Sequence, residues 1–219
     1  MKKLIIILIT VYCGINIYAG DTTYYNAIRQ SLKIAYSAYI PKNYQQLANV
    51  CERIALVKSH EWLPYYYCAY AYINMGYMEK NADNKDKLCD KAEQFLDSAM
   101  RIKPNEPENY IIKALIYYGR MEVNPMIRGV LYFPKSVNAL DEAEKLDPKN
   151  PRVFYLRGRS TMSMPTFMGG GKEAAYPILQ KALILFSEYK TQSNIHPNWG
   201  KEHAQILLNE CKAEINAKK

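Results

Sequence analysis

The feature that most constrains this chain is an internal repetition with a spacing of 44 residues. Three separate columns recur at this spacing: His60, Pro104 and Pro148; Ala55, Ala99 and Ala143; and Tyr66, Tyr110 and Phe154. Self-similarity of this length is typical of arrays that stack one small supersecondary motif on the next. The 219 residues therefore predict one short solenoid.

Each unit has the pattern of two helices. Ala92, Leu96 and Ala99 stand at i, i+4 and i+7, which places them on one face of a helix. Pro104 ends that helix, and a second helical run begins near Tyr110. Apolar residues make up 49% of the chain, enough to fill a core between such helices. Small residues in the columns would let the paired helices approach closely.

These columns resemble the tetratricopeptide (TPR) repeat from about residue 29 to the end. The clearest unit contains Ala92, Leu96, Ala99, Pro104, Tyr110, Ala114 and Tyr117. The resemblance implies an all-α fold, a right-handed α-solenoid of about four TPR-like helix pairs with a C-terminal capping helix. Other two-helix solenoids, such as the HEAT type, fit the spacing of 44 better and the residue columns worse.

The helices and inserts can be placed approximately. We expect helices near residues 22–39, 43–58, 62–78, 85–102, 106–121, 135–146, 151–162, 171–187 and 198–216. The TPR period is about 34 residues, so two units carry inserts, at 78–87 and 121–133. Turn residues such as Asn81 and Asn124 predict that both inserts lie on the surface. The apolar residues of the second insert should fold back and wall one side of a groove.

The first 19 residues have the organisation of a secretory signal peptide. Two lysines precede an apolar stretch, and cleavage is expected after Ala19. The TPR-like repeat domain would then be residues 20–219, exported to the periplasm or outside the cell. The apolar stretch is too short for a comfortable membrane span, so no integral span is expected after cleavage. Lipid attachment at Cys13 and retention of the segment as an anchor remain alternatives.

No catalytic or metal-binding pattern is found. The histidines His60, His196 and His203 form no ligand motif, and the cysteines lack metal-site spacing. The run Gly169 to Lys172 lacks the flanking residues of a phosphate-binding loop. We therefore expect no enzyme activity, no cofactor and no metal. The formal charge of +8 is a basic bias spread along the helices, and an exported chain would have little access to nucleic acid.

Cys51 and Cys68 should face each other. They stand at similar distances before and after the turn at His60, on neighbouring antiparallel helices. Export would permit a disulfide between them. Buried free thiols are the other option.

The TPR resemblance also implies where a partner binds. In that family the first helices of the units line a concave face, and the matching residues are Tyr67, Asn74, Ile111, Tyr118, Arg152, Tyr155 and Arg159. The predicted function is an exported scaffold that binds a protein or peptide partner through this face. A small-ligand-binding accessory protein of a transport or glycan system is the alternative.

An arginine row is the most specific part of that prediction. Arg152, Tyr155 and Arg159 share one helix face, because seven residues make about two turns. Arginines in this arrangement suit the carboxylates of an acidic or C-terminal peptide segment. The competing interpretation is that both arginines pair with acids of the chain itself, such as Glu108 or Glu122.

Overall fold

The computed structural model describes residues 23–218, and every regular element in that range is helical. A first helix is described over residues 23–37. It is followed by α2 (Pro41–Val57), α3 (Trp62–Met78), α4 (Ala82–Ile102), α5 (Pro107–Val123), α6 (Pro125–Leu146), α7 (Pro151–Ser163), the 3-10 turn η1 (Thr166–Met168), α8 (Lys172–Glu188) and α9 (Lys201–Ala217). Most of these bounds lie within a few residues of those predicted.

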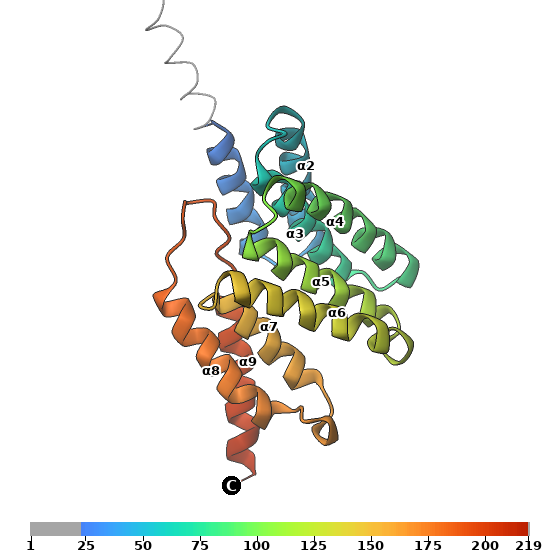
Figure 1. The fold of residues 1–219 in the computed structure, drawn as a ribbon, viewed down its shortest axis with the longest axis vertical. Helices are drawn as coiled ribbons and strands as arrows, with labels where there is room; N and C mark the ends of the chain where they lie inside the picture. Colours follow the sequence, from blue (N-terminus) through green and yellow to red (C-terminus); the bar gives the residue numbers. More distant parts are fainter. Residues whose placement is uncertain (1–22, 219) are drawn as a thin grey trace, which may run out of the picture.

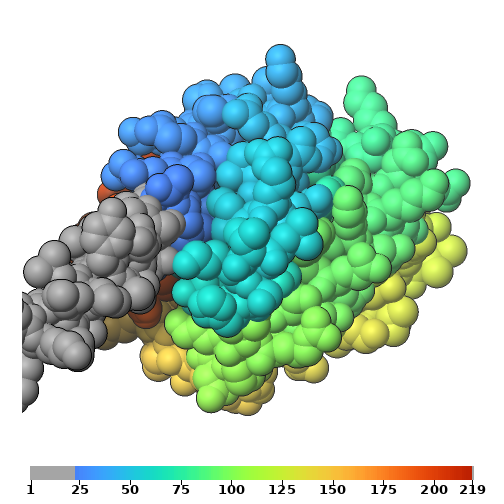
Figure 2. All heavy atoms as spheres, turned by 90° about the horizontal axis from the view of Figure 1, so that it is seen from above, coloured from blue at the N-terminus to red at the C-terminus, as the bar shows by residue number. Residues whose placement is uncertain are grey.

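The helices stack as an α-solenoid (Figure 1). Helix 23–37 with α2, α3 with α4, α5 with α6 and α7 with α8 form four pairs, and α9 packs on α8 at the C-terminal end. Figure 2, viewed from above, shows the units following one another from blue through cyan and green to yellow. The predicted all-α solenoid of four helix pairs with a capping helix is confirmed.

Proline and asparagine define where the helices start. Four helices begin with a proline: Pro41, Pro107, Pro125 and Pro151. At this position the missing N–H is not needed, and the fixed φ already suits a helix. Three helices have asparagine caps whose side chains accept a backbone N–H of the first turn: Asn81, Asn124 and Asn150.

Small residues let the helices of a pair approach closely. The repeated alanines Ala55, Ala99 and Ala143 are all buried. A Cβ at Gly158 of α7 would come within 2.7 Å of the Leu179 side chain of α8. Only glycine fits this approach without displacing its neighbour.

The two inserts are mostly helical, which corrects the prediction of turn-rich segments. Their residues extend α4 and α6 at the N-terminal end, so that these helices have 21 and 22 residues, against 17 in α3 and α5. The asparagines that suggested turns are Asn81 and Asn124, and each is an N-cap. Both inserts do lie at the surface, with Met126 and Val130 among the most exposed apolar side chains.

The described cysteines are free. Cys51, Cys68, Cys89 and Cys211 are buried thiols, and the Cys68 thiol donates to the Ala48 carbonyl over 3.9 Å. Cys51 and Cys68 are therefore buried free thiols, the second of the two predicted options, and no disulfide joins them. The predicted signal peptide, residues 1–19, lies outside the described residues. Within 23–218, no helix combines the length and apolar character needed to cross a membrane.

Candidate functional site

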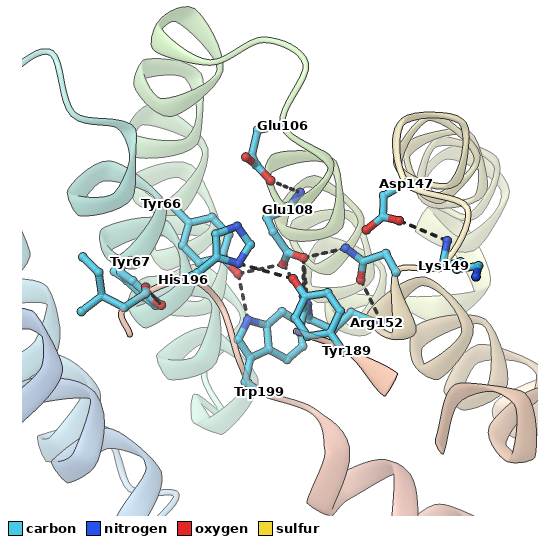
Figure 3. A network of polar contacts seen from close by, with 12 residues as sticks. Tyr66, Tyr67, Glu106, Glu108, Asp147, Lys149, Arg152, Tyr189, His196 and Trp199 are labelled. Atoms are coloured by element: carbon cyan, nitrogen blue, oxygen red, sulfur yellow. Dashed lines mark hydrogen bonds and ion pairs between the residues drawn. The ribbon is translucent and has the colours of Figure 1, made fainter. Parts of the chain in front are cut away.

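A buried ion pair joins the third and fourth helix pairs. The Arg152 guanidinium of α7 donates from Nε to Glu108 Oε1 and Oε2 over 2.9 and 2.8 Å, and from a terminal nitrogen to Oε1 over 2.5 Å. Asn150 also donates to Glu108, over 2.7 Å. Both charged side chains are fully buried. Figure 3 shows Glu108 at the centre of this network.

The C-terminal segment, residues 189–200, completes the network. Trp199 donates from its indole nitrogen to the Tyr66 hydroxyl over 2.8 Å, and the Tyr67 hydroxyl donates to the Ile195 carbonyl over 2.6 Å. The Arg152 guanidinium lies over the Tyr189 ring, 4.5 Å from its centroid. The C-terminal segment thus packs against the first helices α3 and α7 (Figure 3).

This packing corrects the predicted arginine row. Burial by itself would lower the pKa of the Arg152 guanidinium, but the Glu108 carboxylate raises it above its usual range. Arg152 is therefore a charged group whose partner belongs to the same chain. It has no exposed surface to offer a peptide. The competing interpretation is the one observed: Arg152 pairs with Glu108 and Arg159 with Glu122.

Other predicted residues of the concave face are also covered. Tyr67 and Ile111 have no exposed surface, and Tyr155 is 5% exposed. The Tyr155 hydroxyl makes a hydrogen bond of 2.6 Å with Nδ1 of His203 on α9. Asn74 is half-buried and donates to the carbonyl of Tyr70 in its own helix. The sequence could not show that the C-terminal segment and α9 fill the space expected for a partner.

An apolar groove opens elsewhere, between the N-terminal half of α6 and the C-terminal end of α7. Its volume is about 1090 Å³, slightly above the usual range of about 300–1,000 Å³ for ligand pockets. Its lining residues are Tyr118, Met121, Glu122, Pro125, Met126, Gly129, Val130, Phe133, Pro134, Leu156, Arg159, Ser160, Ser163, Met164, Pro165, Phe167 and Met168. Of the seven predicted partner-binding residues, Tyr118 and Arg159 line this groove.

The groove follows from a mismatch in helix length. Helix α6 has 22 residues and the next helix, α7, has 13, so α7 leaves the N-terminal turns of α6 uncovered. Pro134 within α6 cannot donate to the carbonyl four residues earlier, which favours a bend there. The chain after α7 turns through η1 and forms the opposite wall.

The walls of the groove expose large apolar side chains to water. Met126 is 90% exposed, Val130 82%, Phe167 88% and Met168 62%. Single exposed apolar residues are common on proteins, but a contiguous set facing one groove indicates a binding surface. The second insert supplies one apolar wall of this groove, but as the first turns of helix α6 and away from the predicted concave face.

Two of the lining residues, Arg159 and Glu122, carry charge. Their closest charged atoms are 3.6 Å apart, and Glu122 also pairs with Lys85 over 3.1 Å. The Arg159 guanidinium lies 4.9 Å from the centroid of the Tyr77 ring. Burial would lower the pKa of Arg159, whereas Tyr77, Tyr155 and Glu122 raise it, so the group stays charged. The groove thus combines one ion pair with a predominantly apolar lining.

Metal-binding clusters of acidic, histidine and cysteine side chains are absent from the described part of the chain. The lining of the groove does include four methionine thioethers, from Met121, Met126, Met164 and Met168, and the phenol of Tyr118. Thioether sulfur and phenolate oxygen can both ligate the metal ion of a bound cofactor.

A scan against protein-family models and a search of curated proteins found no match. Among solved structures, the HusA haemophore from Porphyromonas gingivalis superposes with a TM-score of 0.78 and 30% sequence identity, over 87% of this chain and 94% of that chain. This chain belongs to the HusA family. A thermophilic TPR protein of Thermus thermophilus aligns with a TM-score of 0.62 and 16% identity, over 88% and 82% of the two chains. At that identity the likeness shows the TPR-type fold alone.

One wall of the groove in this member of the HusA family was missed by sequence reasoning. Phe167 and Met168 precede a run of glycines, Gly169 to Gly171, which suggests only a flexible turn. The signal that could have identified this wall is an aromatic and a methionine side chain placed where a turn normally carries polar residues.

Proposed function

We propose that this chain binds a porphyrin-class ligand, haem being the first candidate, in the groove between α6 and α7. The observation that carries the proposal is the set of exposed apolar side chains on both walls. A porphyrin is a broad, flat and largely apolar molecule, which suits a groove with two such walls. The relationship to a haemophore supports the same ligand class.

The apolar contacts are large enough to matter. Burying one Met, Val or Phe side chain contributes about 1.5–3 kcal/mol. Met126, Val130 and Phe167 are nearly fully exposed without ligand, so covering all three would contribute about 4.5–9 kcal/mol. That is comparable to the cost of association, about 4–15 kcal/mol. Contacts with the rest of the lining supply the remaining affinity.

The test is a titration of the chain with haem and with iron-free protoporphyrin, followed by Soret absorbance and quenching of tyrosine and tryptophan fluorescence. The double variant Val130→Ser with Phe167→Ser should weaken binding by at least about tenfold, since about 1.4 kcal/mol is tenfold. Leu56→Ser is the matched control, because Leu56 is 83% exposed on α2, away from the groove. Absence of binding, or equal binding by the double variant, would overturn the proposal.

A protein or peptide partner is the second candidate. The observation in its favour is the methionine content of the groove, since methionine-rich apolar surfaces adapt to different peptide side chains. An amphipathic helix laid along the groove would be the expected mode. Pull-down from the exported fraction with the wild-type chain and the groove double variant tests this. Partners captured equally by both would contradict it.

Export forms part of the same proposal. The organisation of residues 1–19 supports secretion, and a ligand carrier outside the cell needs that route. Mass spectrometry of the protein recovered from the culture medium and the periplasm should find a chain that starts at Gly20. Recovery of only the full-length chain from the cytoplasm would refute export.

A further inference from the structure

Among the described residues that line the groove, Arg159 is the cation, and its pairing with a carboxylate is long. The ion pair with Glu122 spans 3.6 Å, longer than the 2.7–2.9 Å typical of a charge-assisted hydrogen bond. The Arg159 side chain is 31% exposed. A guanidinium has five N–H donors in a planar fork, and the contacts of Arg159 with Glu122 and Tyr155 do not use all of them.

The other arginines of α7 differ in this respect. Arg152 is fully buried and bound to Glu108 through three short contacts. Arg157 pairs with Asp141 over 2.7 Å and with Glu144 over 2.5 Å. Arg152 and Arg157 therefore have close carboxylate partners, whereas the carboxylate partner of Arg159 is farther away, at 3.6 Å.

The surroundings of Arg159 allow its partner to change. Glu122 is also paired with Lys85 over 3.1 Å, and only 12% of the Lys85 side chain is exposed. If Arg159 turned toward a ligand, the Glu122 carboxylate would still be neutralised by Lys85. The Tyr77 ring, 4.9 Å from the guanidinium, would continue to position it.

We propose that the groove selects ligands that combine an apolar body with a carboxylate, and that Arg159 binds this carboxylate in place of Glu122. The inference rests on the proposed function and adds the chemical group that is recognised. Met126, Val130 and Phe167 contact the apolar body, and Arg159 fixes its orientation through the acid. Haem and protoporphyrin carry propionate carboxylates and meet both requirements. An apolar ligand of the same shape without an acid meets only the first.

The experiment compares protoporphyrin IX with its dimethyl ester, which keeps the macrocycle and removes the charge. Both are titrated into the wild-type chain and into Arg159→Gln, Glu122→Gln and Arg157→Gln. The wild type should bind the acid at least about tenfold more tightly than the ester, the scale of one charge-assisted contact. Arg159→Gln should reduce that preference to less than about threefold while leaving ester binding unchanged.

The control variants make the test specific. Arg157→Gln removes an arginine from the same helix outside the groove and should keep the full preference for the acid. Glu122→Gln removes the competing carboxylate and should tighten binding of the acid alone. The preference should also decrease as the salt concentration rises, because a partly exposed ion pair is screened.

Three outcomes separate the hypotheses. Equal binding of acid and ester by the wild type would overturn the carboxylate site and leave the porphyrin proposal standing. An Arg159→Gln variant that loses acid and ester affinity equally would show that Arg159 only supports the groove wall. If neither ligand binds, the proposed function fails and the carboxylate site fails with it. The wild-type comparison needs no variant, so it is unaffected if Arg159→Gln folds poorly.

Discussion

Replacing Arg152 by glutamine tests whether the buried ion pair stabilises the fold or serves binding. The variant leaves the Glu108 carboxylate buried without its cation, and both side chains have no exposed surface in the wild type. Removing one partner of such a pair costs about 3–5 kcal/mol, mostly because the remaining charge is uncompensated. At about 2–4 °C per kcal/mol for a domain of this size, the melting temperature should fall by about 6–20 °C.

Urea unfolding followed by far-ultraviolet circular dichroism measures this loss directly. Arg157→Gln is the matched control, because its ion pairs with Asp141 and Glu144 are partly exposed and should contribute no more than about 1 kcal/mol. Below the unfolding transition, Arg152→Gln should bind porphyrin as the wild type does. A stability loss under about 1 kcal/mol, or weaker ligand binding by a fully stable variant, would refute the structural role.

Three further results are expected. Gly158→Ala should cost about 1–3 kcal/mol in urea unfolding, because its Cβ would come within 2.7 Å of Leu179; an unchanged midpoint would contradict the close approach. Burial raises the pKa of the Cys89 thiol from 9.0 to about 11. The unfolded chain therefore loses this proton first, so the free energy of unfolding should decline as the pH rises from 9 toward 11. Urea unfolding measured at several pH values should show a smaller decline for Cys89→Ala. Asn124→Ala removes the N-cap of α6; it should lower the free energy of unfolding by about 1 kcal/mol and also weaken porphyrin binding. Asn81→Ala removes the N-cap of α4; it should lower the free energy of unfolding by the same amount and leave porphyrin binding intact. Equal effects of the two variants on binding would argue against a role of α6 in the groove.

The repeat architecture could be predicted because its signals are local. Alanine columns, proline starts and helical spacing each depend on residues within one unit, so the helices and their pairing are readable from the sequence. For example, α6 ends shortly before Pro148, and α7 begins at Pro151. The helical inserts were misread because Asn81 and Asn124 suit a turn and an N-cap equally well.

The site was harder to predict because it depends on contacts between distant residues. Trp199 bonds to Tyr66, 133 positions earlier, and nothing in the sequence of the C-terminal segment indicates that contact. The TPR resemblance placed binding residues on the first helices, where the chain itself covers Tyr67 and Arg152. Arg159 lies farther along α7, where it lines the groove and pairs with Glu122.

The C-terminal segment also changes how this solenoid should fold. In a simple repeat array each unit contacts only its neighbours, and the ends can unfold independently. Here Tyr67 bonds to Ile195 across 128 positions, which ties the last part of the chain to the second helix pair. Such sequence-distant contacts couple the units into one cooperative transition and slow folding, because a long loop must close before the contacts form. The terminal units of this protein should therefore unfold together with the middle ones.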